Sequence, residues 1–295
     1  MKPSPFTYHR PGSTSEALEV LARLGDAGKV LAGGQSLVPL MSMRLAAPAN
    51  LVDINHLPEL DSVEVTETVV RVGALARHSR VEHDEPAYAA IPLLRQGLRN
   101  VAHPTIRNRG TTVGSIVHAD PAAEMPAVLA LLDGVVEVRS AHGDRDVPAS
   151  GFFLGPMESA VRPGELAVAV TFRRPAAGSG SAFQELARRH GDYAMCGVGA
   201  VVTTDPDGAL TTARVALISV GGGPVLVDVT DAITGSGGGF DAASLHALVE
   251  GPIDPETDIH ATADYRRNLA HVLTARVLDE AHANAMASRR QERVA

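Results

Sequence analysis

A strand, a glycine pair, a helix and a second strand follow one another near the N-terminus, and this order limits the folds open to the chain. The apolar run 29–32 leads into Gly33-Gly34-Gln35-Ser36. Apolar residues then recur at helical spacing from Leu37 to Leu45, and residues 51–54 form the second apolar run. The pattern predicts a small βαβ unit with a glycine turn at the start of its helix.

A second glycine-bearing segment, Arg109-Gly110-Thr111-Thr112-Val113-Gly114-Ser115, lies further along the chain. We read it as a loop between a helix at 88–101 and a helix that begins with Asp120 as N-cap and Pro121 as first residue, and ends at Gly134. Unpaired backbone N–H groups at glycine turns and helix starts bind phosphate, so two such segments suit a diphosphate.

Taken alone, these glycines are explained more simply as tight turns. Neither segment has the GxGxxG or GxxxxGK[ST] spacing, so the ordinary Rossmann and P-loop nucleotide sites are not supported.

The rest of the chain predicts mixed helix and sheet. Residues 63–65 and 69–73 are typical of a hairpin, and residues 176–181 are small and aperiodic, which favours a flexible linker and a domain boundary. Beyond it we expect an antiparallel sheet covered by helices. The further expected strands are 135–139, 145–147, 166–172, 195–204 and 213–220, and the further expected helices are 242–249 and 262–287.

Composition excludes several classes of function. The chain has 26 Lys+Arg against 34 Asp+Glu, a net charge of −8, which argues against nucleic acid or an anionic membrane as its partner. No apolar stretch is long enough for membrane insertion, so we expect a cytoplasmic protein. Cys196 is the only cysteine and the 12 histidines are scattered, so any iron–sulfur cluster must belong to a partner and no metal site is predicted.

The two glycine segments, in this order, resemble the FAD-binding motifs of a known family. Ala32-Gly33-Gly34-Gln35-Ser36-Leu37, with the apolar runs that follow, is similar to the first motif of the FAD-binding medium subunits of molybdenum hydroxylases, the carbon monoxide dehydrogenase and xanthine dehydrogenase family. Residues 109–115 with 119–124 are similar to the second motif. The resemblance continues through 187–194 and 264–269, so it spans nearly the whole chain.

This resemblance implies an α+β fold. Residues 1–176 would form the FAD-binding domain of the vanillyl-alcohol oxidase or PCMH type, with subdomains 1–56 and 57–176. Residues 181–288 would form the C-terminal domain of the carbon monoxide dehydrogenase flavoprotein type, an antiparallel sheet packed with helices.

The resemblance also implies that the backbone of both segments wraps the FAD pyrophosphate, with no catalytic residue and no metal ligand in this chain. The implied cofactor-binding residues are Ala32, Gly33, Gly34, Gln35, Ser36, Leu37, Thr111, Thr112, Val113, Gly114, Ser115, Asp120, Glu124 and Tyr193.

Several of these residues keep a purely structural alternative. Asp120 either caps a helix or lies near the flavin, Glu124 either reaches a ribose hydroxyl or is a solvated first-turn carboxylate, and Tyr193 either lies near the isoalloxazine ring or is a half-buried tyrosine. The family's second motif has adjacent glycines where this chain has Val113-Gly114, so Val113 must take a negative φ or the turn must differ.

The implied function is an FAD-carrying oxidoreductase subunit of a heterotrimeric molybdenum hydroxylase, assembled as a dimer of heterotrimers. A large partner would hold the molybdopterin cofactor, and a small partner would pass electrons through two [2Fe–2S] clusters to FAD in this chain. The acceptor would be a quinone, NAD or oxygen. Two alternatives stay open: a stand-alone FAD-dependent reductase of the same fold, and a nucleotide-binding or assembly module without redox chemistry.

Overall fold

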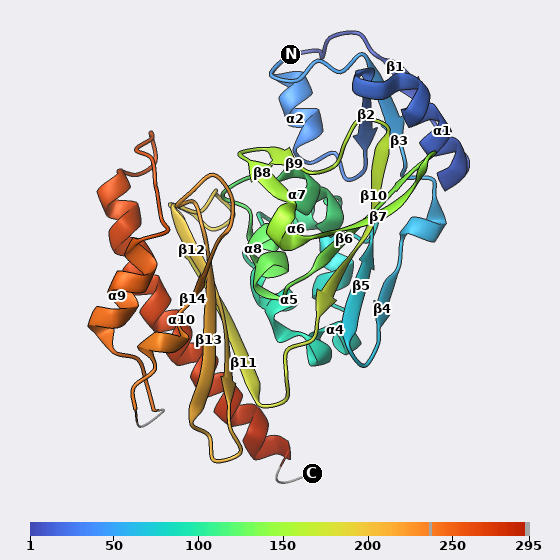
Figure 1. Ribbon diagram of the computed structural model, residues 1–295. Helices are drawn as coiled ribbons and strands as arrows, with labels where there is room; N and C mark the ends of the chain where they lie inside the picture. The colour runs from blue at the N-terminus through green and yellow to red at the C-terminus, as the bar shows by residue number, and fades with distance from the viewer. Residues whose placement is uncertain (236–237, 293–295) are drawn as a thin grey trace.

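The computed structural model describes residues 1–235 and 238–292, and its N-terminal end is a small parallel sheet (Figure 1). The strand order is β1-β3-β2, with both pairs parallel, which confirms the predicted βαβ unit. The hydroxyl of Ser13 caps the first helix by accepting from the N–H of Glu16. The elements are β1 (Thr7–His9), α1 (Thr14–Leu24), β2 (Gly28–Leu31), α2 (Leu37–Ser42) and β3 (Asn50–Asp53).

An antiparallel sheet of order β4-β5-β10-β6-β7 follows, and the predicted hairpin is confirmed as its β4–β5 pair. Its strands are β4 (Val63–Val65), β5 (Val69–Gly73), β6 (Val135–Ser140), β7 (Gly143–Pro148) and β10 (Glu165–Arg173). The helices inserted between β5 and β6 are α3 (His78–Glu82), α4 (Glu85–Ala90), α5 (Pro92–Leu98), α6 (Pro104–Arg107), α7 (Thr112–His118) and α8 (Glu124–Leu131). A two-stranded ribbon, β8 (Phe153–Gly155) with β9 (Glu158–Ser159), precedes β10.

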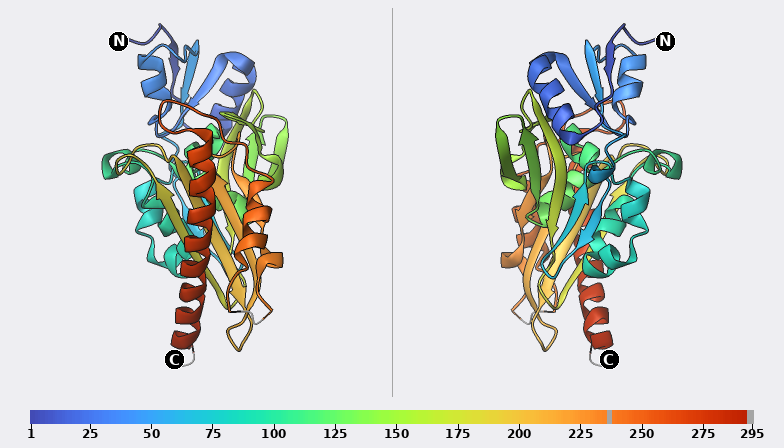
Figure 2. Two further views of the ribbon diagram at one scale, coloured as in Figure 1. Left: turned by 90° about the vertical axis from the view of Figure 1, so that its left-hand side faces the viewer. Right: turned by 90° about the vertical axis from the view of Figure 1, so that its right-hand side faces the viewer.

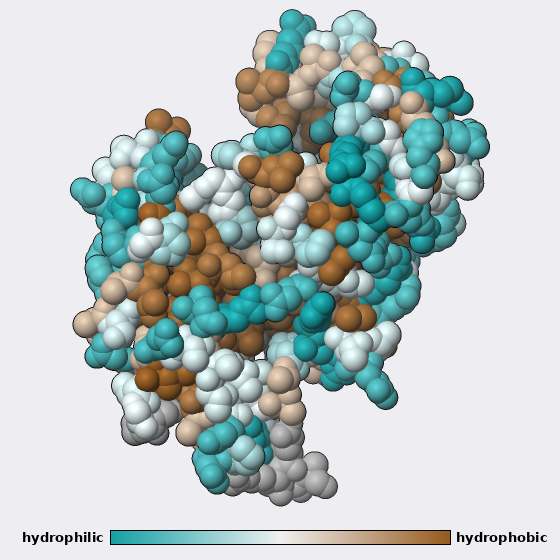
Figure 3. All heavy atoms as spheres, viewed as in Figure 1, coloured by the Kyte–Doolittle hydropathy of each residue, from teal (hydrophilic) through white to brown (hydrophobic). Residues whose placement is uncertain are grey.

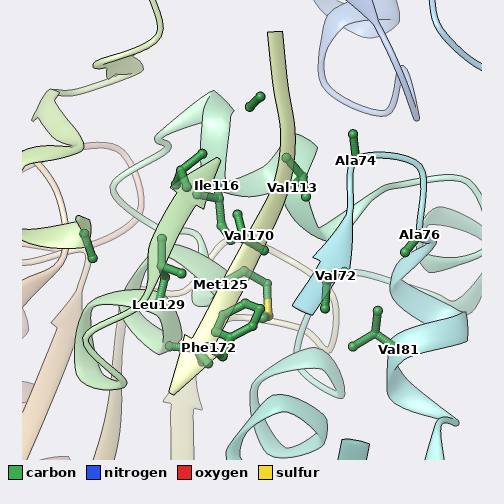
Figure 4. Close-up of a cluster of buried hydrophobic side chains, with 14 of the residues drawn as sticks. Val72, Ala74, Ala76, Val81, Val113, Ile116, Met125, Leu129, Val170 and Phe172 are labelled. Atoms are coloured by element: carbon green, nitrogen blue, oxygen red, sulfur yellow. The ribbon is translucent and has the colours of Figure 1, made fainter. Parts of the chain in front are cut away.

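The core of this part lies between the antiparallel sheet and helices α7 and α8. Figure 4 shows Val170 and Phe172 of β10 beside Ile116 of α7 and Met125 of α8, and all four side chains are almost completely buried. This packing fixes α7, and with it the second glycine segment, against the sheet.

The C-terminal part is an antiparallel sheet of order β11-β12-β13-β14, as expected. The long helix α10 packs along β11 and β12, while α5 and α8 contact the sheet from the other part of the chain (Figures 1 and 2). The elements are β11 (Ser179–Leu186), β12 (Cys196–Thr204), β13 (Leu210–Ile218), β14 (Val225–Asp228), α9 (Ala242–Glu250) and α10 (Ala263–Glu292). Within the described residues, no helix combines the length and apolarity that a bilayer crossing needs.

The structure corrects several sequence-based boundaries. The helix expected at 88–101 is two helices, because Pro92 forces Ile91 out of the α region, to φ −143° and ψ 85°. The segment expected to be a flexible linker contains the start of β11 at Ser179, where pairing with Thr203 of β12 overrides its small, aperiodic composition. The turn at 205–208, between β12 and β13, is closed by a hydrogen bond from the N–H of Gly208 to the carbonyl of Asp205.

Candidate cofactor-binding site

The two glycine segments lie in direct contact. An ideal Cβ placed on Gly33 would come 2.6 Å from the carbonyl oxygen of Arg109 and 3.0 Å from the amide nitrogen of Thr111. Both separations are too short for a real side chain, so only glycine permits this approach. Figure 1 shows α2 and α7, which follow the two segments, beside the hollow that Figure 3 shows between the lobe of β1–β3 and the part that carries α9.

Unpaired main-chain N–H groups gather at this contact. Among the residues that the structure describes, none accepts a hydrogen bond from the N–H groups of 33–37, of Thr111 or of Val113. Gly34 takes a φ of 71°, and the side-chain amide of Gln35 donates to the carbonyl of Gly33 at 3.0 Å, which holds the first turn in shape. Such a set of amides suits an anion with several acceptor oxygens.

The second segment is a helix start, and our reading of it as a loop is wrong. Thr111 is the N-cap of α7, and its Oγ1 accepts from the N–H of Gly114 at 3.1 Å. A Cβ on Gly114 would come 2.6 Å from that oxygen, so glycine lets the cap close tightly. Val113 lies in the helix without a positive φ, which is why the chain needs no second glycine there.

The side chains of Thr112 and Val113 point into the protein. Thr112 Oγ1 lies 3.2 Å from Nδ1 of the buried His78, and Val113 is 2% exposed within the core drawn in Figure 4. Burial, with a smaller effect of the Arg107 charge, lowers the pKa of His78 to about 3, so this imidazole is neutral. Only the backbone of Thr112 and Val113 is available to a cofactor.

A polar network that the sequence analysis missed ties the two segments together. The Arg77 guanidinium donates to the carbonyl of Arg109 and to Oδ1 of Asn55, both at 2.7 Å. Asn55 in turn donates to the carbonyl of Ala32 at 2.8 Å and to Asp53 at 2.6 Å. One arginine and one asparagine therefore set the spacing between the segments.

Charged groups surround this contact. Burial, followed by repulsion from the Arg109 charge, lowers the pKa of Arg77, although Asp61 and Asp53 oppose this. Although burial opposes it, hydrogen bonds from Tyr8 and Asn55 lower the pKa of Asp53, so this carboxylate stays ionised in the network. The pair of arginines adds attraction for an anion at the unpaired amides.

At the far end of α7, about 10 Å away for a seven-residue helix, the remaining predicted residues gather. Asp120 is not the N-cap of the next helix: its Oδ1 accepts from the N–H of Ala122 in a turn, and α8 begins only at Glu124 with Ala123 as N-cap. Asp120 is nonetheless 8% exposed and near enough to Glu124 to affect its ionisation.

Carboxyl groups crowd this end. Burial, and then the Asp120 charge, raise the pKa of Glu124 to about 7, although a backbone hydrogen bond and Arg107 oppose them. Burial and Glu124 raise the pKa of Glu185, a β11 residue that the sequence analysis missed, to about 8. Glu185 Oε2 is buried and has no hydrogen-bond partner among the described residues.

Tyr193 adjoins the carboxyl groups. Its pKa is raised by partial desolvation and by the charges of Asp120 and Glu124, yet 69% of the residue is exposed in this chain, so it is not the half-buried tyrosine of the structural alternative. It lines a cavity of about 220 Å³ with Arg188, Gly191, Asp192, Met195 and His260. The predicted residues thus form two groups, one at each end of α7.

Comparison with known families decides what this arrangement is. Residues 4–174 match the family described as the FAD binding domain in molybdopterin dehydrogenase, and residues 181–281 match the CO dehydrogenase flavoprotein C-terminal domain. The chain belongs to this FAD-binding family. It is an FAD-binding medium subunit of the molybdenum hydroxylase group and an oxidoreductase subunit, as the resemblance implied.

Full-length relatives agree with this assignment. The chain is 40% identical over 286 residues to the 6-hydroxypseudooxynicotine dehydrogenase complex subunit alpha of Paenarthrobacter nicotinovorans, covering 95% of this chain and 96% of that protein. It is 35% identical to the carbon monoxide dehydrogenase medium chain of Afipia carboxidovorans, covering 97% and 99%. A solved chain of CO dehydrogenase from Oligotropha carboxidovorans superposes with a TM-score of 0.90 at 32% identity, covering 96% of this chain and all of that one.

Proposed function

We propose that this chain is the FAD-carrying electron-transfer subunit of a heterotrimeric molybdenum hydroxylase. In the proposed complex, FAD bound here would accept electrons from [2Fe–2S] clusters of a small partner and release them to an external acceptor, while a large molybdopterin-binding partner oxidises the substrate. The single observation that carries the proposal is the contact of Gly33 with Arg109 and Thr111, which gathers unpaired amides from both segments at one point.

The donors at this contact fit a diphosphate. Main-chain N–H groups of 33–37, Thr111 and Val113 can each donate to a phosphate oxygen, and the hydroxyls of Ser36 and Ser115 would add further donors. The positive charges of Arg77 and Arg109 would offset part of the negative charge of the diphosphate. We propose Ala32, Leu37, Gly114 and the buried Thr112 as backbone neighbours of the cofactor.

The far end of α7 fits the ring end of a dinucleotide. Helix α7 has seven residues and is about 10 Å long, which an extended dinucleotide can span. An FAD whose diphosphate binds at Thr111 would therefore reach Asp120, Glu124 and Tyr193. The exposed ring of Tyr193 offers an apolar face for stacking, and Asp120 and Glu124 offer acceptors for hydroxyl groups.

The chain's own thiol supports the need for partners. Cys196 is buried, and burial raises its pKa to about 12, so it neither ligates a cluster nor reacts at ordinary pH. Relatives with similar identity to this chain are subunits of enzymes named for a nicotine derivative, caffeine and carbon monoxide. This variety is consistent with a substrate site on another subunit. We also propose the domain boundaries 1–176 and 181–288 and an assembly of two heterotrimers.

An absorbance titration tests the proposal. Recombinant chain, freed of flavin and titrated with FAD, should bind one equivalent and show the flavin band of a protein-bound cofactor. Coexpression with the proposed large and small partner subunits should yield a complex in which substrate bleaches that band. Stoichiometric FAD without partners but with turnover of an organic substrate would favour the stand-alone reductase, and partner binding without flavin would favour the assembly module.

A further inference from the structure

Two histidines and a glutamate meet between α9 and α10, on the side of the C-terminal part away from the cofactor-binding segments (Figures 1 and 2). His246 and Glu250 lie one turn apart on α9, which places them on one helix face. His271 comes from α10, and one ligand atom from each of the three residues lies within 4.8 Å of the other two. The two imidazole rings stack, with centroids 3.7 Å apart and planes 10° apart.

The glutamate is already oriented by its neighbours. Its Oε2 lies 2.8 Å from Nε2 of His271, and its Oε1 accepts from the Arg267 guanidinium at 2.7 Å. The contact with Arg267 is the kind of outer hydrogen bond that commonly fixes a ligating carboxylate in metal sites. Contacts on both carboxylate oxygens therefore hold Glu250 beside the imidazole of His271.

Two polar atoms beside the group lack a protein partner. Nδ1 of His271 and Oγ1 of Thr274 are buried, and neither hydrogen-bonds to any described residue. Both residues, with His246, line a cavity of about 230 Å³ between the helices. Unpaired buried polar atoms are costly, so this arrangement favours a bound species that satisfies them, such as a cation with its coordinated water.

We propose that His246, Glu250 and His271 bind one divalent cation of the zinc class. Two imidazoles and one carboxylate, with a fourth position left for water, form a ligand set that zinc uses in proteins. Tetrahedral bonds of about 2.0–2.2 Å hold ligand atoms roughly 3.3–3.6 Å apart. The widest separation here therefore has to close by about an ångström, and the 2.8 Å contact of Glu250 with His271 has to open by roughly half an ångström or more. Two parallel stacked rings cannot both direct a nitrogen lone pair at one ion, so the exposed His246 has to rotate out of the stack to bind.

Bound metal would join α9 to α10 at a point remote in sequence from the cofactor segments. Because no residue is shared with those segments, the cation would stabilise the C-terminal part without changing flavin affinity. The sequence predicts no metal site here because the third ligand lies 21 positions from the second.

Zinc titration of the untagged, EDTA-treated full chain tests the proposal. Competition with a chromophoric chelator should show one equivalent bound, and zinc should raise the thermal midpoint. The matched variant is His246→Phe, which keeps an aromatic ring to stack on His271 but removes the ligand, and it should lower zinc affinity at least tenfold. His246→Cys should restore binding, because thiolate is also a zinc ligand, and His142→Ala, at an exposed turn, should bind as the unmodified chain does.

The outcomes separate clearly. Loss of the bound equivalent in His246→Phe with recovery in His246→Cys supports the site. If the unmodified chain binds no stoichiometric zinc, or if His246→Phe binds zinc equally well, the proposed site is overturned. The three residues would then be a hydrogen-bonded and stacked group without a metal. FAD content, measured in parallel, should be the same in every variant.

Discussion

The guanidinium of Arg77 donates one 2.7 Å hydrogen bond to the carbonyl oxygen of Arg109 and another to Oδ1 of Asn55. Because Asn55 donates to the carbonyl of Ala32, Arg77 links the two cofactor segments. Hydrogen bonds from a charged donor contribute about 1.5–3 kcal/mol each. We therefore expect Arg77→Met to lower FAD affinity at least tenfold and to lower the thermal midpoint by several degrees. Equilibrium titration and thermal unfolding measure both effects.

Arg80 provides the matched control for Arg77, because it lies one turn along and pairs at the surface with Asp61. Exposed pairs contribute at most about 1 kcal/mol, so Arg80→Met should leave FAD affinity unchanged. Equal losses in both variants would show that Arg77 acts through general charge and not through the segments it connects.

Gly33 should tolerate no side chain. Alanine there would place Cβ 2.6 Å from a main-chain carbonyl, so the two segments must separate. We expect Gly33→Ala to lose at least tenfold in FAD affinity, about 1.4 kcal/mol, while unfolding remains cooperative. Gly151→Ala, where nothing lies within 4 Å of the added Cβ, should titrate like the unmodified chain, and retained affinity in Gly33→Ala would refute the contact as the binding point.

The N-cap of α7 should matter through its hydroxyl. Thr111→Ala removes the acceptor for the N–H of Gly114, at a cost of about 1 kcal/mol, and loosens the segment that carries two of the unpaired amides. We expect lower stability and weaker FAD binding, both recovered in Thr111→Ser. If serine fails to restore binding, the methyl packing of Thr111 and not its cap sets the segment.

The carboxyl cluster should make the cofactor-free chain less stable at alkaline pH. The pKa of Glu124, about 7, and that of Glu185, about 8, lie above the ordinary glutamate value, so ionisation costs more in the folded chain than in the unfolded one. The unfolded chain then holds fewer protons between about pH 4.5 and 8, and stability falls as pH rises through that window.

Glu185→Gln should flatten this profile and raise the thermal midpoint by a few degrees at pH 8, with little change at pH 5. Thermal unfolding from pH 5 to pH 9 measures it, and Glu19→Gln, on the exposed face of α1, serves as the control. An unchanged slope in Glu185→Gln would show that the carboxyl is solvated in the folded chain.

Local patterns predict most of the strands and the secondary structure around the first cofactor segment, because a strand, a glycine pair and a helix each leave a signature in consecutive residues. The second segment was harder: Thr111 and Gly114 carry a helix N-cap, but the glycines drew attention to a loop. Asp120 and Pro121 are residue types typical of a helix start. The Asp120 carboxylate instead accepts from the N–H of Ala122 in an Asx turn, and α8 begins only at Glu124.

The residues that join the site were beyond local reasoning. Arg77 lies 32 positions from Arg109, and Glu185 meets Glu124 only because the C-terminal sheet packs against α5 and α8. No spacing in the sequence records such contacts. His246 and His271 illustrate the same limit, since only the packing of α9 on α10 stacks their rings.

A crystal structure of the chain grown with FAD would show where the diphosphate binds. We expect diphosphate oxygens within about 2.7–3.2 Å of main-chain nitrogens from both 33–37 and the start of α7, with the flavin end directed toward Tyr193. A diphosphate bound away from Gly33 and Thr111, or held by side chains alone, would contradict it.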